Sequence, residues 1–188
     1  MSSQAPEAAL TALKDGNLRF LANEHRRPDA AGWSEIHARN AEGQAPFAAI
    51  LGCADSRVGP EILFDQLLGD LFVVREAGNV GVSASTVGSL EYAVAALGVR
   101  LVVVLGHTQC GAVGAAFDDA DVPGQIRAVL DSIRPGISGT ASPRHAVLAN
   151  ARAGVANLRA HSEILSDDAL TIIPAIADVA NGGVEFLD

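Results

Sequence analysis

Leu101-Val-Val-Val-Leu-Gly106 is the most apolar of three short runs that we interpret as strands, and it leads directly into His107-Thr-Gln-Cys110-Gly111. Continuous apolar runs of this kind are typical of parallel strands that are covered on both faces. The small residues that follow Cys110 predict the start of a helix. This order of strand, polar turn and helix favours an α/β fold, in which ligands gather at the carboxyl edge of the sheet.

Two other apolar runs, 47–52 and 70–75, predict two more strands, and the first of them ends at Cys53-Ala-Asp-Ser-Arg57. A last pair of strands is expected at 170–173 and 184–187, with an edge position for the first because Pro174 cannot donate a ladder hydrogen bond. Helices are expected at 6–22, 35–41, 60–66, 83–97, 125–133 and 144–164, with a connector at 135–143. We therefore expect an α/β fold with a central, mostly parallel β-sheet flanked by helices and an amino-terminal helical arm.

Length and charge limit the classes of protein that fit. At 188 residues the chain suits a single domain. Its 22 acidic residues outnumber 13 basic ones, so a surface that follows nucleic-acid phosphates is not expected. The start lacks the features of an export signal, and no apolar stretch approaches the roughly 20 residues of a membrane span. We therefore expect a cytoplasmic protein with neither a nucleic-acid nor a membrane partner.

The two cysteines of the chain each lie near the end of a predicted strand. Cys53 follows the first run, and Cys110 lies three residues after His107, which follows the third. Thiolate and imidazole ligands select zinc over magnesium or calcium. Cys53, His107 and Cys110 together therefore predict a zinc site. The alternatives are three buried core side chains or a dithiol redox pair.

Asp55 is a candidate fourth ligand, and Arg57 determines its role. Side chains two apart in an extended turn point the same way, so this carboxylate and guanidinium can pair. If Asp55 binds zinc, four protein ligands close the site. If Arg57 holds Asp55, a water molecule can bind and react. A surface ion pair with little energetic effect is the remaining alternative.

Cys53-Ala-Asp-Ser-Arg57 together with His107-x-x-Cys110-Gly111 resembles the β-class carbonic anhydrases, and the similarity covers most of residues 8–113. The resemblance implies reversible hydration of carbon dioxide to bicarbonate and a proton by zinc-bound hydroxide. It implies that Cys53, His107 and Cys110 hold the zinc. It also implies catalytic roles for Asp55 and Arg57, with Asp55 a zinc ligand only in a closed resting state.

The same resemblance implies a substrate pocket and an oligomer. The pocket residues would be Gln44, Phe72, Ala77 and Tyr92. The assembly would be a homodimer or a homotetramer. We accordingly divide the single domain, residues 1–188, into a helical arm and linker (1–43), a zinc-site core (44–117) and a helical and edge-strand region (118–188).

The composition of the zinc site also bears on pH and on alternatives. Two thiolates cancel the formal charge of zinc, so the metal should acidify its water less than a site of three neutral histidines does. We therefore expect activity to rise above neutral pH. Hydrolysis of carbon disulfide or carbonyl sulfide at the same zinc, and a zinc-binding module without catalysis, are the alternative functions.

Overall fold

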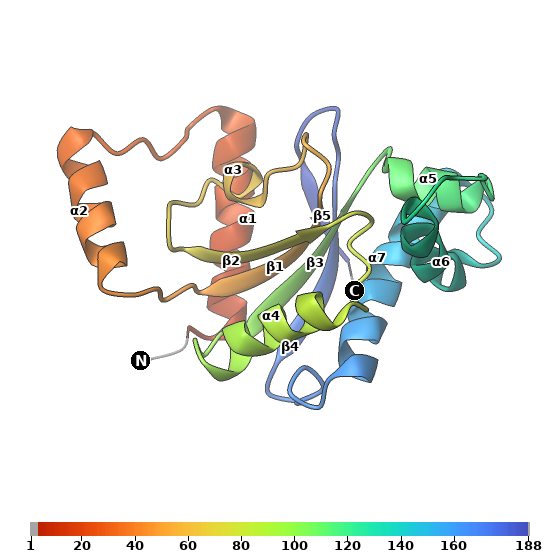
Figure 1. The fold of residues 1–188 in the computed structure, drawn as a ribbon. Coiled ribbons are helices and arrows are strands. Elements are labelled where there is room, and N and C mark those ends of the chain that lie inside the picture. Colours follow the sequence, from red (N-terminus) through yellow and green to blue (C-terminus); the bar gives the residue numbers. More distant parts are fainter. Residues whose placement is uncertain (1–3, 188) are drawn as a thin grey trace.

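The computed structural model describes residues 4–187 and arranges them around a five-stranded sheet (Figure 1). Its strands are β1 (Ala48–Cys53), β2 (Leu71–Glu76), β3 (Leu101–His107), β4 (Thr171–Ala177) and β5 (Val184–Phe186). Their order across the sheet is β2-β1-β3-β4-β5. The first four are parallel, and β5 is antiparallel to β4.

Helices cover both faces of this sheet. They are α1 (Pro6–Ala22), α2 (Ala30–Ala41), α3 (Pro60–Leu63), α4 (Ala84–Ala95), α5 (Gly111–Phe117), α6 (Ile126–Ile137) and α7 (Pro143–His161). Alternate residues of β3 enter two apolar cores: Val103 packs on the side of α1 with Leu13, and Val104 packs on the side of α4 with Leu90. Because both faces are covered, every residue of β1 and β3 is buried. The predicted fold class is confirmed.

Pro174 lies inside the sheet, so the predicted edge position of its strand is wrong. β4 runs between β3 and β5, and Pro174 pairs with Val104 of β3. The Pro174 carbonyl accepts a hydrogen bond from the Leu187 N–H at 2.9 Å, just beyond the end of β5. The N–H and the carbonyl of a strand residue point to the same side, so the N–H that proline lacks would face β5. At Pro174 the ladder between β4 and β5 has already ended, so the missing donor falls beyond it.

Three helix boundaries also differ from expectation. α2 begins earlier, at Ala30, because the Asp29 side chain caps it by accepting a hydrogen bond from the Gly32 N–H at 2.8 Å. α3 ends before Asp65, which adopts a left-handed φ of 46°. α6 continues through Pro135, so the expected connector begins later.

The amino-terminal segment forms a helical arm in which α2 stands away from the sheet (Figure 1). The link between α1 and α2 is anchored on Asp65, whose carboxylate accepts hydrogen bonds from Arg19 Nε at 2.6 Å and from the Arg26 N–H at 3.0 Å. Burial alone would raise the pKa of Asp65, but these donors outweigh it and lower the pKa. An ionised carboxylate therefore ties the arm to the segment that follows α3.

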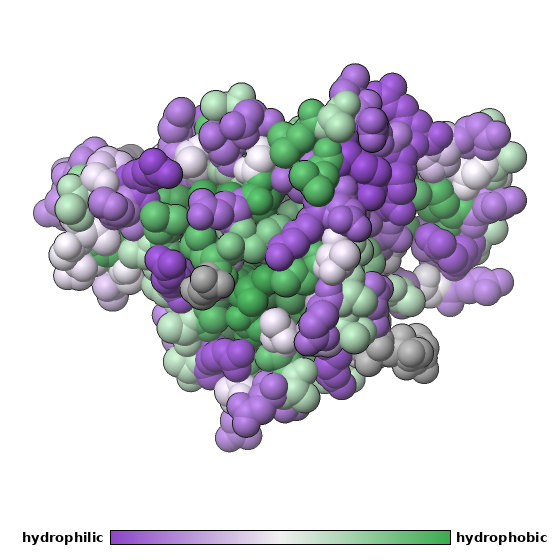
Figure 2. Space-filling model, turned by 180° about the vertical axis from the view of Figure 1, so that it is seen from behind, coloured by the Kyte–Doolittle hydropathy of each residue, from purple (hydrophilic) through white to green (hydrophobic). Residues whose placement is uncertain are grey.

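The back of the molecule exposes apolar side chains. Figure 2 shows them across the middle of this face, bordered by polar ones. Leu18 and Leu21 of α1 are exposed, and they line a cavity of about 720 Å³ together with Val147 and Leu148 of α7. Within residues 4–187, no helix has the combination of length and hydropathy that crossing a membrane requires.

Gly16 and Asn17 fix α1 on the sheet of its own chain. A Cβ atom at Gly16 would lie only 1.8 Å from the Phe64 carbonyl oxygen, so the helix backbone packs directly against the segment after α3. Asn17 is buried and donates from Nδ2 to the Gly182 carbonyl at 2.9 Å, while its Oδ1 accepts from the Val184 N–H at 2.9 Å. α1 thereby also holds the hairpin that leads into β5.

Replacement of Gly16 by alanine should destabilise the fold, because the new methyl group meets a backbone atom that cannot move independently. We expect a loss of about 3 kcal/mol in the free energy of unfolding, measured by urea denaturation. Gly88→Ala is the matched control, since this helical glycine has open space around its Cβ position. That control should gain about 0.5–1 kcal/mol from helix propensity. Equal stability of the two variants would contradict the close packing of α1.

Candidate metal centre

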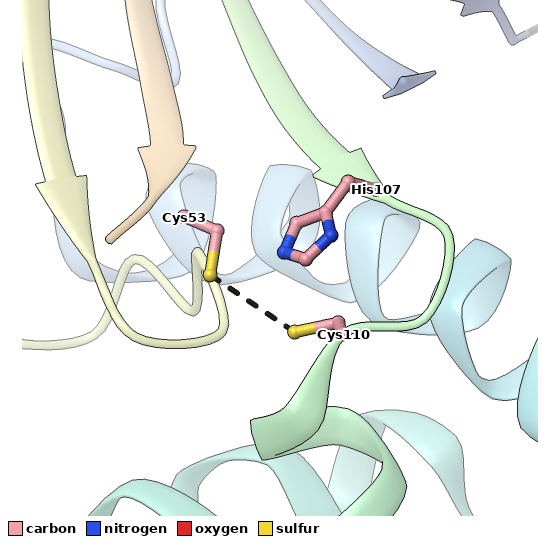
Figure 3. A group of neighbouring side chains, drawn as sticks. All are labelled: Cys53, His107 and Cys110. Atoms are coloured by element: carbon pink, nitrogen blue, oxygen red, sulfur yellow. Dashed lines mark hydrogen bonds between the residues drawn. The ribbon is translucent and has the colours of Figure 1, made fainter. Parts of the chain in front are cut away.

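Cys53, His107 and Cys110 converge at the carboxyl edge of the sheet (Figure 3). Cys53 is the last residue of β1 and His107 the last residue of β3, and these two strands are neighbours. Cys110 is the residue directly before α5. The two sulfur atoms lie 4.0 Å apart, and all the potential ligand atoms lie within 4.8 Å of one another. The structure therefore brings together the three side chains that the sequence indicated.

The turn between β3 and α5 brings Cys110 back toward His107. Gln109 adopts a left-handed φ of 56°, which reverses the chain within two residues. Thr108 is held on both sides: its N–H donates to the Ala177 carbonyl at 2.9 Å, and its Oγ1 accepts from the Val179 N–H at 3.0 Å. The end of β4 thus fixes the turn that carries two of the three side chains.

The imidazole of His107 is prepared for a metal. It is fully buried, and its Nδ1 lies 2.9 Å from the Thr108 carbonyl, a contact that assigns the ring proton to Nδ1. Nε2 then carries a lone pair, and it has no hydrogen-bond partner among residues 4–187. A buried polar atom without a partner is costly unless an ion satisfies it. The position of Nε2 within the cluster is therefore evidence for a ligand.

The two sulfur atoms lie close enough for one thiol to donate to the other. The Cys110 thiol donates to Cys53 and lowers the pKa of Cys53 to about 4 despite burial, and the same contact raises the pKa of Cys110. A cation that binds both sulfurs would displace the remaining thiol proton, which leaves to solvent. Two thiolates and one imidazole, with room for one further ligand, fit catalytic zinc. Cys53, His107 and Cys110 would hold this ion.

Arg57 holds Asp55 beside the cluster. Arg57 Nε donates to Asp55 Oδ1 at 2.9 Å and Nη2 donates to Oδ2 at 2.7 Å, and the Arg57 N–H also donates to Oδ1 at 2.9 Å. Asp55 Oδ2 lies 3.9 Å from His107 Nε2. The Arg57 side chain is the main cause that lowers the pKa of Asp55. Asp55 is therefore an ionised carboxylate, fixed in direction, at the edge of the metal centre.

The four expected pocket residues do not gather in one place within the chain. Ala77 lies beside the cluster, because the next residue, Gly78, donates its N–H to Cys53 Sγ at 3.4 Å. Phe72 and Tyr92 contact each other, with ring centroids 6.3 Å apart. Phe72 pairs with Ala49 of β1, well before the end of that strand at Cys53. Gln44 is exposed in the connector before β1.

Arg75 supports the centre, although it was not among the predicted site residues. Its Nε donates to the Cys53 carbonyl at 2.9 Å, and its Nη2 donates to the Asp55 carbonyl at 2.5 Å. These bonds fix the segment that carries Cys53 and Asp55. The sequence shows Arg75 at the end of an apolar run that resembles the family, but its contacts with the Cys53 segment depend on the pairing of β1 with β2.

Comparisons with known proteins agree with this geometry. A family model described as carbonic anhydrase matches residues 48–184. The chain belongs to the carbonic anhydrase family. It is 48% identical over 141 residues to carbonic anhydrase 2 of Mycobacterium tuberculosis (strain CDC 1551 / Oshkosh), across 73% of this chain and 67% of that relative. It is 36% identical over 198 residues to a carbonic anhydrase of Pseudomonas aeruginosa, across 93% and 86% of the two chains.

Solved structures identify the β class. A β-carbonic anhydrase of Aspergillus fumigatus matches with a TM-score of 0.73 and 27% identity, over 97% of this chain and 90% of that one. The β-carbonic anhydrase of Coccomyxa matches with a TM-score of 0.74 and 26% identity, over 95% and 86%. The chain is thus a β-class carbonic anhydrase, a zinc enzyme that reversibly hydrates carbon dioxide to bicarbonate and a proton. The resemblance drawn from the sequence is confirmed.

Loss of the His107 imidazole should remove zinc from the protein. We expect one zinc per chain in the wild-type carbonic anhydrase and little zinc in His107→Ala, measured by elemental analysis after gel filtration. His161→Ala is the matched control, because His161 is exposed and its Nδ1 contacts only the Asn157 carbonyl of its own helix. Full zinc content in His107→Ala would exclude this residue as a ligand.

Proposed function

We propose that Asp55 and Arg57 are the catalytic pair of this carbonic anhydrase. The observation that carries the proposal is the doubly hydrogen-bonded contact of Arg57 with Asp55, which leaves Asp55 Oδ2 3.9 Å from His107 Nε2. Oδ1 already accepts two hydrogen bonds, whereas Oδ2 accepts one and retains a lone pair for a further donor. A carboxylate placed in this way can accept a hydrogen bond from a molecule at the metal centre without itself becoming the fourth ligand.

Zinc, when bound, supplies a Lewis acid that makes water a nucleophile near neutral pH. The part of Asp55 is to orient that water. An ionised carboxylate only accepts hydrogen bonds, so the water O–H must point to Asp55 and an oxygen lone pair is directed away from it, toward the carbon of carbon dioxide. Arg57 keeps Asp55 in this orientation by occupying both of its oxygens.

Asp55 is proposed as a hydrogen-bond acceptor rather than as a proton store. Arg57 lowers the pKa of Asp55 below its ordinary acidic value, so the carboxylate remains ionised at any pH where the enzyme would work. Its effect on the rate should therefore not depend on pH across the neutral range. Any rise of activity with pH must come from another group.

Asp55→Asn should retain zinc and lose activity, because the amide can donate where the carboxylate only accepts. We expect a fall on the order of 100-fold in kcat, as for a misdirected reactant. Stopped-flow hydration of carbon dioxide from pH 6 to 9, with zinc analysis of the same samples, makes this measurement. The wild-type rate should rise toward pH 9, and the ratio of the two rates should stay constant because Asp55 does not titrate in this range.

The control for this change is Asp121→Asn, which breaks a similar carboxylate–guanidinium contact, with Arg127 at 2.7 Å, on the exposed surface. It should leave the rate unchanged. Loss of zinc in Asp55→Asn, or a rate equal to that of the wild type, would refute an orienting role for Asp55. A flat wild-type profile would refute the expected effect of the two thiolates.

We propose further that the enzyme is a homodimer, or a homotetramer built from dimers, and that Gln44, Phe72, Ala77 and Tyr92 line its substrate pocket. Phe72 and Tyr92 lie away from the metal centre of their own chain, near the edge strand β2. Tyr92 is 51% exposed and lies beside Phe72, so the two rings offer aromatic surface to a second subunit. A second subunit packed on this edge would cover these rings and use them for its own pocket. A cytoplasmic location, where both free cysteines stay reduced, suits this enzyme.

Tyr92→Lys should weaken the assembly and reduce carbon dioxide hydration without loss of zinc, because a charge replaces a ring that we place in the interface. Sedimentation velocity and zinc analysis give the two readouts. Ile126→Lys is the control, since Ile126 is also an exposed apolar residue, on α6 at the far side of the molecule from β2 (Figure 1). A wild-type enzyme that sediments as a monomer with full activity would contradict the shared pocket.

A further inference from the structure

The loop between β2 and α4 lies against one of the zinc ligands. The Gly78 N–H donates to Cys53 Sγ at 3.4 Å. Such a bond directs the sulfur and withdraws charge from it. The position of Gly78 therefore affects the zinc ligand Cys53, although Gly78 is not a ligand itself.

The conformation of this loop needs support. Gly78 and Asn79 both adopt left-handed conformations, with φ of 77° and 43°. The positive φ of Gly78 favours glycine, and a Cβ atom there would lie 2.6 Å from Ile133 Cδ1, which would have to move. The Glu76 carboxylate holds the far end of the loop by accepting from the Gly81 N–H at 2.6 Å. A backbone in this conformation persists only where its surroundings hold it.

α7 supplies the support from a distant part of the sequence. Asn150 Nδ2 donates to the Gly78 carbonyl at 2.7 Å, and Asn157 Nδ2 donates to the Val80 carbonyl at 2.9 Å. Asn150 is 3% exposed, in a helix whose other buried residues are mostly small or apolar. A buried amide at this position would be costly without its hydrogen bond. The bond to Gly78 explains why an amide lies there.

We propose that Asn150 is a positioning residue for the metal centre: by holding the Gly78 carbonyl, it keeps the Gly78 N–H directed at Cys53 Sγ. Asn150 donates its hydrogen bond to Gly78 rather than to a ligand atom, so it acts through Gly78. Groups that support metal ligands in this indirect way typically contribute 10–100-fold to metal affinity or activity. The inference rests on zinc binding by Cys53, and wild-type zinc content tests that assignment separately.

Asn157 provides a matched comparison within the same helix. It makes the same kind of bond, from a side-chain amide to a carbonyl of the same loop, but to Val80, which does not donate to a sulfur. Loss of either bond leaves a carbonyl of the loop without its donor. A role in loop stability alone would therefore lower the unfolding temperature of both variants, more so for the more buried Asn150, and leave their zinc affinities alike. A positioning role separates them.

The test compares Asn150→Leu with Asn157→Leu, which remove the donor at similar volume. Zinc affinity is measured by competition with a chelator, and the near-ultraviolet absorption of the cobalt-substituted protein reports the bond between metal and sulfur. We expect Asn150→Leu to lose about 10–100-fold in zinc affinity with a shifted absorption band, and Asn157→Leu to stay within about threefold with an unchanged band. The midpoint temperature of thermal unfolding should be lower in both variants than in the wild type.

Equal losses of zinc affinity in the two variants, or no loss in either, would overturn the inference. If Asn150→Leu does not fold, a measurement on the wild-type protein can still overturn the inference. When the NMR-active cadmium isotope replaces zinc, the Gly78 amide proton should show a coupling to the metal through the N–H···S bond. Absence of this coupling in a protein that binds one cadmium per chain would overturn the inference, whereas failure to bind cadmium or zinc at all would refute the metal centre itself.

Discussion

The parallel pairing of β1 with β3 is the constraint on which the metal centre depends. The two strands are neighbours in register, so their last residues, Cys53 and His107, reach the same edge of the sheet. A shift of one residue in either strand would turn its final side chain to the opposite face. The apolar residues of β1 and β3 prevent that shift, because alternate side chains are buried in two different cores. The same packing that stabilises the sheet therefore fixes the geometry of the ligands.

The surroundings of the centre direct each donor. The Thr108 carbonyl leaves Nε2 of His107 for the metal, and the Gly78 N–H meets the sulfur of Cys53. Arg57 occupies Asp55, and Arg75 ties the backbone of the Cys53 segment to β2. These contacts come from three separate segments of the sequence, around Arg57, residues 75–78 and Thr108. A carbonic anhydrase site of this kind thus depends on the whole sheet edge and not on the three ligands alone.

Much of this could be predicted from the sequence, because the strongest signals are local. Apolar runs predicted the parallel strands, and the cysteine and histidine side chains at or just after their ends predicted the ligands. The position of Pro174 could not be predicted, because whether a strand lies at an edge depends on which other strand pairs with it. The same holds for Asn150, which lies 72 residues from its partner Gly78. Phe72 and Tyr92 show the remaining difficulty, since the place where they would act lies outside their own chain.

Zinc-edge X-ray absorption of the purified enzyme tests the composition of the centre most directly. Two sulfur ligands at about 2.3 Å and an imidazole nitrogen at about 2.0 Å are expected if Cys53, His107 and Cys110 hold one ion in each chain. A coordination shell without sulfur, or one with four sulfur atoms drawn from two chains, would contradict the centre described for this carbonic anhydrase.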